Sequence, residues 1–234
     1  MCGRFTLADL TWREVHDLMR GIRPAKWVEE ELAGVREISS RYNVAPSQDV
    51  PMVRITRRED GELVPGWARW GLIPRWFKKS LKEWKASTIN ARAETVAEAP
   101  SFRDAYRSPT GRCIIPMSGY YEWSTLTPQK EAYYVSPASN EPGFLTLGLW
   151  TEVDLPDWSG ATVTMLTEAA TGQVATIHDR QPIIVDDEGA RRWLDGEPLE
   201  TIPRQPPEKR RMHKVGRAVN SWKSQGPDLI RPSD

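Results

Sequence analysis

A cysteine at position 2 is the residue of this chain with the most distinctive chemistry. It follows Met1 directly, and removal of that methionine leaves a free α-amine and a thiol on adjacent carbons of Cys2. Their ordinary pKa values, about 7.7–8.0 for the amine and about 8.5 for the thiol, make both nucleophiles partly available near neutral pH. An aldehyde condenses with the amine to an imine, and the thiol then closes a five-membered thiazolidine. The plainer alternative is a small residue at an ordinary chain start.

Three further residues have side chains that suit proton transfer or substrate positioning. Glu122 lies among aromatic neighbours, which indicates a desolvated carboxyl with a raised pKa that can act as a proton donor. Strand alternation puts Tyr121 and Trp123 on the opposite face, so we expect this desolvation to come chiefly from other strands. His178 can relay protons, and Asn90 can hold an amine or a sugar without adding charge. Each also has a structural interpretation, as a solvent-facing carboxylate, a packing histidine and a turn asparagine.

The charges of this chain are segregated although the net charge is zero. Residues 54–112 carry 13 basic and 7 acidic side chains and residues 201–234 carry 8 and 3, whereas 113–200 carry 4 and 14. Two basic segments around an acidic one can converge into a positive face that binds phosphates. Ordinary solvated surface charge is the alternative interpretation.

Composition restricts the class of protein. The 234 residues, 39% hydrophobic and 27% charged, predict one globular domain over residues 1–234. No apolar stretch approaches the roughly 20 residues of a membrane helix, and the start lacks the apolar segment of a signal peptide, so a cytoplasmic location is expected. Two cysteines and three histidines offer little material for a disulfide framework or a metal site, and we expect no metal and no cofactor.

Short strands dominate the predicted elements, because nineteen prolines interrupt helices throughout. One amphipathic helix is expected near the start, capped by Asp9. Strands are predicted at 50–56, 63–70, 112–115, 119–123, 132–136, 144–150, 161–166 and 182–185. Short helices are predicted at 100–106, 169–175 and 188–194, and a surface loop at 197–214. This pattern predicts an α+β fold, a single domain built on a mostly antiparallel, barrel-like β-sheet with short flanking helices.

Several short segments occur in a fixed order along the chain: MCGRF at 1–5, RYNVAP at 41–46, INARAE at 89–94, GYYEW at 119–123, IHDR at 177–180 and VGRAVN at 215–220. In this order and spacing they closely resemble the SOS-response-associated peptidase (SRAP) family, whose members crosslink themselves to abasic sites in single-stranded DNA. The resemblance extends over nearly the whole chain. It implies a monomeric sensor and covalent shield of abasic sites that associates with the nucleoid when bound to DNA.

The resemblance also implies roles for individual residues. Cys2, Asn90, Glu122 and His178 match the catalytic positions, with Glu122 as the acid that opens the closed abasic sugar. Phosphate contacts, an aromatic pair beside the lesion and a pocket wall are implied for Arg4, Asn43, Pro46, Trp76, Phe77, Arg92, Thr167 and Arg180. Met1 must be removed first, either by an aminopeptidase or by the thiol autoproteolysis that is proposed for the family.

Two other functions remain open on the sequence. Type II glutamine amidotransferases also begin with Met-Cys-Gly and use the α-amine as a base for the thiol. The remainder of this chain, however, carries neither their glutamine-binding segments nor a synthase domain. The third possibility is a noncovalent reader of DNA ends or modified bases, in which Cys2 takes no part.

Overall fold

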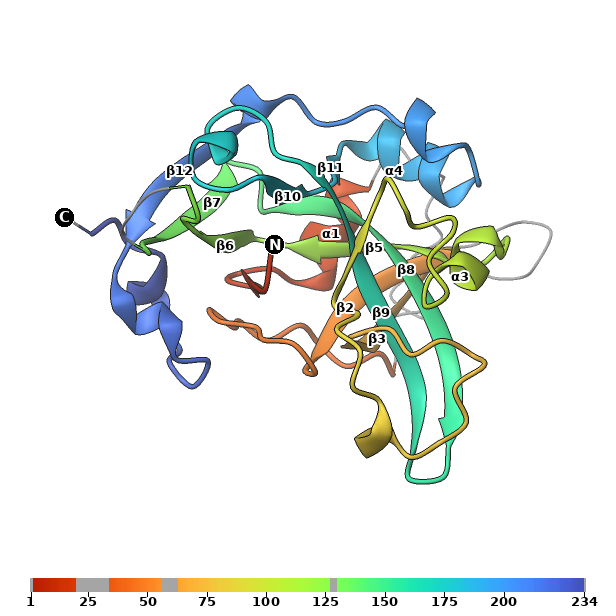
Figure 1. The fold of residues 1–234 in the computed structure, drawn as a ribbon. Helices are drawn as coiled ribbons and strands as arrows, with labels where there is room; N and C mark the ends of the chain where they lie inside the picture. The colour runs from red at the N-terminus through yellow and green to blue at the C-terminus, as the bar shows by residue number, and fades with distance from the viewer. Residues whose placement is uncertain (1, 20–33, 56–62, 127–129, 234) are drawn as a thin grey trace.

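The computed structural model describes residues 2–19, 34–55, 63–126 and 130–233 (Figure 1). Its strands are β1 (Arg4–Thr6), β2 (Asp49–Ile55), β3 (Leu63–Trp70), β4 (Asn90–Arg92), β5 (Arg112–Met117), β6 (Gly119–Trp123), β7 (Ala132–Pro137), β8 (Phe144–Leu155), β9 (Trp158–Ala169), β10 (Arg180–Pro182), β11 (Ile184–Val185) and β12 (Arg210–Val215). Its helices are α1 (Trp12–Leu18), α3 (Arg103–Arg107) and α4 (Asp187–Leu194). Short 3₁₀ turns are η1 (Leu81–Glu83), η2 (Val174–Thr176), η3 (Leu199–Thr201), η4 (Pro207–Lys209), η5 (Arg217–Asn220) and η6 (Pro227–Ile230).

Five strands close into a barrel. β9 pairs with β3, β3 with β2, β2 with β5 and β5 with β8, and β8 pairs back with β9. Of these pairings β3–β9 is parallel and the others are antiparallel. The structure therefore confirms the predicted α+β fold on a mostly antiparallel, barrel-like sheet. Figure 1 shows the far ends of β8 and β9 extending as a long hairpin at the lower right.

A second, four-stranded sheet in the order β1-β6-β7-β12 carries the start of the chain. Its pairings are all antiparallel, and Arg4 lies opposite Tyr121 in the β1–β6 register. The Thr6 hydroxyl fixes this register, because it lies 2.8 Å from the Ser118 hydroxyl and 2.9 Å from that of Tyr134, all of them buried. Cys2 is thereby held beside the strand that carries Glu122.

Helix α1 begins later than predicted. Asp9 does not cap it, since its φ of 52° places that residue in the left-handed region before the helix. Thr11 is the N-cap: its hydroxyl accepts from the Glu14 main-chain N–H, and the Glu14 carboxylate accepts from the main-chain N–H of Thr11. This reciprocal capping box satisfies two main-chain donors, which a lone aspartate two residues earlier does not.

The other boundaries show where long-range pairing overrides local pattern. The bounds of β3 and β6 match the predicted 63–70 and 119–123, whereas β8 and β9 each extend to 12 residues along their shared hairpin. The helix predicted at 169–175 is wrong, because β9 continues to Ala169 and only the turn η2 follows. The loop predicted at 197–214 is wrong at its end, where β12 pairs with β7. β12 has the sequence RRMHKV, in which adjacent polar and charged residues leave no apolar alternation for a hydrophobic-pattern search to detect.

The core is continuous across the barrel. Trp70 and Trp193 are fully buried within it, and Cys113 is completely buried in β5, as expected for a strand residue without chemistry. In the described ranges, none of the helices combines the length and the apolar character needed to cross a membrane.

Gly119 at the start of β6 is a position where any side chain would disturb the site-bearing strand. A Cβ there would collide with the Tyr134 hydroxyl and lie 2.7 Å from the main-chain oxygen of Val135 on β7. We expect Gly119→Ala to lower the melting temperature by about 5 °C or more, because overpacking costs about 1–3 kcal/mol. Gly66→Ala is the matched control, since Gly66 is also in a strand but has open space around the added methyl group. Equal thermal shifts for both variants would contradict this assignment.

Candidate functional site

Four residues from distant parts of the chain meet beside β6. The Asn90 side-chain amide at the start of β4 donates to the Cys2 main-chain oxygen at 2.7 Å. His178, between η2 and β10, has its Nε2 3.8 Å from Oε1 of Glu122 in β6. The Glu122 carboxylate in turn contributes to raising the pKa of the Cys2 thiol. The structure thus brings together Cys2, Asn90, Glu122 and His178, although 176 positions separate the first from the last.

The Cys2 side chain is completely buried in the hydrophobic core. Its sulfur lies 3.7 Å from the Arg4 main-chain oxygen, to which the thiol donates. Burial, and secondly the nearby Glu122 carboxylate, raise the thiol pKa far above its ordinary value. At neutral pH the sulfur is therefore a protonated thiol, and its attack on carbon requires a group that takes up its proton.

Glu122 is a buried carboxyl with a proton affinity suited to neutral pH. It is only 2% exposed, and burial raises its pKa from 4.5 to about 7. The buried Tyr120 lies two positions earlier on the same strand, and Oε1 of Glu122 accepts from the Trp123 main-chain N–H at 3.3 Å. Glu122 can consequently give up or accept a proton near neutrality with little driving force in either direction.

The tautomer of His178 is set by the main chain. Its Nδ1 accepts the Arg180 main-chain N–H at 2.9 Å, which leaves the proton of the neutral ring on Nε2, facing Glu122. Asp179 lies 3.1 Å from the same Nδ1 but is largely exposed, and Nδ1 cannot accept one proton and donate another at once. Burial lowers the His178 pKa, so the neutral form predominates at pH 7.

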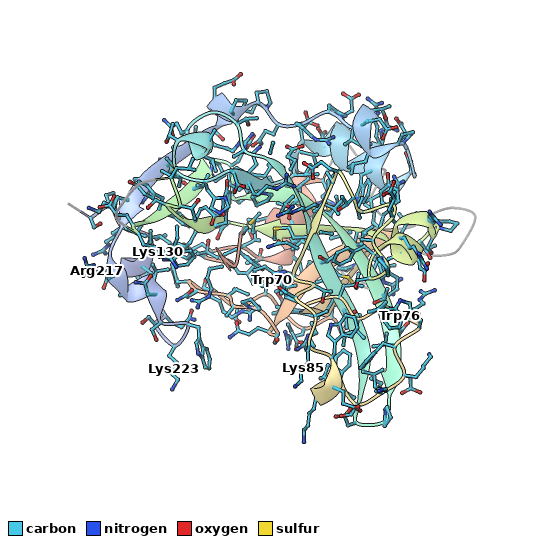
Figure 2. All side chains as sticks on the ribbon, in the orientation of Figure 1. Trp70, Trp76, Lys85, Lys130, Arg217 and Lys223 are labelled. Atoms are coloured by element: carbon cyan, nitrogen blue, oxygen red, sulfur yellow. The ribbon has the colours of Figure 1, made fainter. Side chains whose placement is uncertain are left out.

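An open pocket of about 490 Å³ gives access to Glu122 and His178, whereas Cys2 and Asn90 are not among its lining residues. It is lined by Arg4, Glu122, Trp123, Thr125, Lys130, His178 and Asn220. A second pocket of about 570 Å³ shares Lys130 and Asn220 with the first and adds Lys214 and Arg217. In Figure 2 the labelled Lys130 and Arg217 lie together at one end of the molecule. The two pockets are therefore adjacent, and their linings combine the basic residues Arg4, Lys130, Lys214 and Arg217 with the acidic Glu122 and Glu131, of which Glu131 is paired with Lys214 at 2.9 Å.

Thr125, Lys130 and Asn220 line the pocket although their sequence context predicts no role for them. Asn220 accepts a hydrogen bond from the Trp123 indole at 2.7 Å, which joins the C-terminal segment to β6 across the pocket. Its motif, VGRAVN, is visible in the sequence, but nothing in its local pattern places it beside Glu122. Lys130 likewise cannot be identified as a pocket residue from the sequence. It is a single lysine in an acidic segment, and its place at the pocket depends on the fold.

Arg4 lines the pocket and is held in place by hydrogen bonds to Asn43 and to the main chain. An Arg4 guanidinium nitrogen donates to Oδ1 of Asn43 at 3.0 Å and to the Val219 main-chain oxygen at 3.2 Å. Asn43 is itself fully buried and does not line the pocket. Any part that Asn43 plays in binding therefore acts through Arg4 and the neighbouring main chain.

Arg180 is held by several groups close to His178. Its guanidinium makes two hydrogen bonds to the Glu94 carboxylate, at 2.6 and 2.9 Å, and donates to the Thr167 main-chain oxygen at 2.7 Å. The Thr167 hydroxyl is buried and donates to the Ala91 oxygen at 3.3 Å. Arg92, at the end of β4, is exposed. Both arginines are predicted to contact phosphates. Arg92 is exposed, whereas the guanidinium of Arg180 is restrained by its hydrogen bonds to Glu94 and Thr167.

The aromatic pair that follows β3 divides into an exposed and a buried ring. Trp76 is 53% exposed and its indole donates to the Pro100 oxygen at 3.2 Å, whereas Phe77 is buried against Trp84. Figure 2 places Trp76 at the opposite end of the molecule from Lys130. Pro46 is half-buried. The DNA contacts that the resemblance implies for these three side chains stay predictions.

In the described ranges, no three His, Cys, Asp or Glu side chains cluster in a way that could hold a metal ion.

The chain is similar to several known proteins over nearly its whole length. The family model of the SOS response associated peptidase (SRAP) matches residues 1–222. The abasic site processing protein YoqW of Bacillus subtilis (strain 168) is 35% identical over 98% of this chain and 99% of its own length. YedK of Escherichia coli (strain K12), also named an abasic site processing protein, is 30% identical over 99% of this chain and 100% of its own.

Solved structures show the same fold. A crystal structure of a protein from Bacteroides thetaiotaomicron superposes with a TM-score of 0.71 at 24% identity, covering 94% of this chain and 96% of that one. One from Bordetella bronchiseptica gives a TM-score of 0.68 at 19% identity, covering 92% of this chain and 100% of that one. With a family model over nearly its whole length and relatives of this similarity, the chain belongs to the SOS response associated peptidase (SRAP) family.

Proposed function

We propose that this protein processes abasic sites in single-stranded DNA by crosslinking itself to them through the amine and thiol of a mature N-terminal Cys2. The observation that carries the proposal is the meeting of Cys2 with Asn90, Glu122 and His178, of which the last two line a pocket that also contains Arg4 and Lys130. The relatives named abasic site processing proteins support the substrate class. The buried thiol and the proton-exchanging carboxyl support the covalent step.

Ring opening is the first step, because an abasic deoxyribose is mostly a closed hemiacetal. Glu122, with a pKa of about 7, donates a proton to the ring oxygen, and the aldehyde is released as the C1′ hydroxyl proton passes to water in the pocket, from which Glu122 is protonated again. The Nε2–H of neutral His178 faces Glu122 and orients the carboxyl, and the ring keeps this proton throughout. Both groups are largely buried but border the open pocket, through which water can supply and remove protons.

Capture of the aldehyde takes two bond-forming steps. The α-amine of Cys2 attacks the carbonyl carbon, and loss of one water gives an imine. The Cys2 sulfur then adds to the same carbon, and its proton goes to the imine nitrogen, directly or by way of Glu122. The Asn90 amide holds the Cys2 carbonyl at 2.7 Å throughout, which keeps amine and thiol on the same side of the sugar. The net reaction forms one C–N and one C–S bond and releases one water.

Removal of Met1 is a requirement of this scheme, since an acylated nitrogen cannot form the imine. Two routes lead to the mature terminus: an aminopeptidase, which accepts a small second residue, or attack by the Cys2 thiol on the preceding peptide bond. The second route would make the chain its own thiol protease. Intact-mass measurement of protein purified with and without the Cys2→Ser substitution separates the two routes, because only self-cleavage depends on the thiol.

A gel assay with three matched oligonucleotides tests the proposed function. One carries a single abasic site, one an intact base at that position, and one a tetrahydrofuran analogue that lacks the aldehyde. We expect a heat-stable conjugate with the first strand alone. Equal, salt-reversible retention of all three would support a noncovalent DNA reader, and glutamine turnover without a conjugate would support an amidohydrolase.

Glu94 competes with DNA phosphate for Arg180. Since its carboxylate holds both terminal nitrogens of the guanidinium, we expect Glu94→Gln to raise affinity for single-stranded DNA by up to about fivefold at low salt. The gain should shrink as ionic strength rises. Fluorescence anisotropy with the tetrahydrofuran strand measures this, with the exposed Glu98→Gln as control. Weaker binding of Glu94→Gln would contradict the expectation and indicate that Glu94 holds Arg180 in its binding position.

A further inference from the structure

Trp222 is a large apolar side chain that the fold leaves in solvent. It is 52% exposed and follows the turn η5 in the C-terminal segment. Most tryptophans of a folded domain bury their rings, because an indole in water forgoes about 25 cal/mol for each Å² of apolar surface left exposed. A single exposed ring is common on protein surfaces, so its significance depends on what supports it and on what surrounds it.

Hydrogen bonds hold the main chain on both sides of Trp222. The Asn43 side-chain amide donates to the main-chain oxygens of Val219 at 3.1 Å and Ser221 at 2.8 Å. Beyond the ring, Gln225 accepts from the Tyr42 main-chain N–H at 2.9 Å and donates to the Asn43 oxygen at 3.2 Å. The exposed ring is thus presented from a fixed support, which lowers the entropy cost of binding to it.

The same segment forms part of the reactive pocket. Asn220, two positions before Trp222, lines that pocket together with Glu122 and His178 and accepts from the Trp123 indole. Arg4 also donates to the Val219 oxygen of this segment. Trp222 thus follows, two positions on, a residue that lines the pocket, although it is not itself a lining residue.

The charge around Trp222 fits a nucleic-acid strand. Residues 216–226 include Arg217 and Lys223 and no acidic residue. The Lys223 ammonium lies 5.9 Å from the centre of the Trp222 ring, and in Figure 2 the labelled Lys130, Arg217 and Lys223 lie on the same side of the molecule. A single aromatic face among cations suits an unpaired base with its phosphate, because base stacking on such a ring needs no specific sequence.

We propose that Trp222 is a base-stacking residue, which holds one unpaired nucleobase next to the abasic position while Lys223 faces the adjoining phosphate. This role rests on the proposed function for its substrate, single-stranded DNA. It adds a positioning contact outside the reacting group: a stacked neighbouring base fixes where the abasic sugar enters the pocket. Strands in which that base is stacked inside a duplex would lose the contact, because neighbouring base pairs cover both of its faces.

The test compares Trp222→Phe with Trp222→Leu, which keep apolar bulk but differ in whether an aromatic face remains. Noncovalent affinity is measured by anisotropy with a single strand that carries the tetrahydrofuran analogue. We expect Trp222→Leu to bind about 5- to 100-fold more weakly than the unsubstituted protein and Trp222→Phe to recover most of the loss. Flanking nucleotides are then removed one at a time from each side of the analogue. Removal of one particular nucleotide should weaken the unsubstituted protein but not Trp222→Leu.

Each other outcome overturns the stacking role. Equal affinity of all three proteins excludes it, as does a loss in Trp222→Leu that is the same on fully duplex DNA. A shift in sedimentation of Trp222→Leu with unchanged DNA affinity would assign the ring to contact between protein copies. Failure of the unsubstituted protein to form a conjugate with the abasic strand would refute the proposed function separately, because the anisotropy assay uses a strand that cannot react.

Discussion

Replacing Cys2 with alanine is expected to abolish the heat-stable conjugate with abasic single-stranded DNA while leaving noncovalent affinity within about twofold. Alanine keeps the α-amine, so an imine can still form, but it reverts to the free aldehyde in water because no thiol closes the ring. The assay is a denaturing gel after heating, run beside anisotropy with the unreactive strand. A conjugate from Cys2→Ala of the same yield and heat stability would refute the thiazolidine scheme.

Cys113→Ala is the matched control for this substitution. Both cysteines are free and completely buried, and both thiols have their pKa values raised by burial. Cys113 lies in β5, within the core, whereas Cys2 is beside Asn90 and Glu122. We therefore expect Cys113→Ala to form the conjugate at the normal rate, with a loss of stability of about 1 kcal/mol from the small cavity.

Glu122→Gln is expected to slow conjugate formation by about a hundredfold or more, because the amide has the shape of the carboxyl but cannot donate its proton to the ring oxygen. The pH dependence gives a sharper test. In the unsubstituted protein the rate should fall above pH 7, where Glu122 loses its proton, with a pKa of about 7. That falling limb should be absent in Glu122→Gln, and Glu152→Gln, in an exposed position on β8, should retain it. A falling limb in all three proteins would assign it to another group.

The same substitution has an expected effect on stability. Burial raises the folded-state pKa of Glu122 from 4.5 to about 7, so its contribution to stability is full below pH 4.5 and is lost as pH rises through 7. Glutamine stays neutral, so Glu122→Gln should gain stability relative to the unsubstituted protein between pH 5 and 8. The gain approaches about 3 kcal/mol, roughly 6–12 °C in Tm for a domain of this size. A constant difference in Tm across this range would show that the carboxyl is not buried as described.

Local chemistry makes parts of the fold predictable from sequence. The alternation in β6 and β3 and the acidic cap of α4 at Asp186 are local signals, and the structure follows them. β12 depends on its distant partner β7, and its own residues show too little apolar alternation to reveal it. The far ends of β8 and β9 pair with each other across their hairpin, and the alternation of Glu152, Val153, Asp154 and Leu155 is a local signal that the predicted strand at 144–150 leaves out. The capping box at Thr11 is readable as Thr-x-x-Glu, and the earlier Asp9 obscures it.

The candidate site is likewise predictable from the sequence only in part. The types and order of Cys2, Glu122 and His178 are enough to indicate reactive chemistry, whereas their distances, the tautomer of His178 and the burial of Glu122 depend on the fold. Asn43 illustrates the limit: its motif is recognisable, but its place beneath Arg4 and the segment around Trp222 comes from hydrogen bonds over more than 170 positions.

Mass spectrometry of the trimmed conjugate tests the central claim most directly. The protein is reacted with abasic single-stranded DNA, digested with nuclease and protease, and the sugar-bearing peptide is fragmented. The expected peptide begins at Cys2, lacks Met1, weighs one water less than peptide plus sugar remnant, and carries the remnant on both its nitrogen and its sulfur. Attachment at a lysine, or on a peptide that retains Met1, would contradict the account.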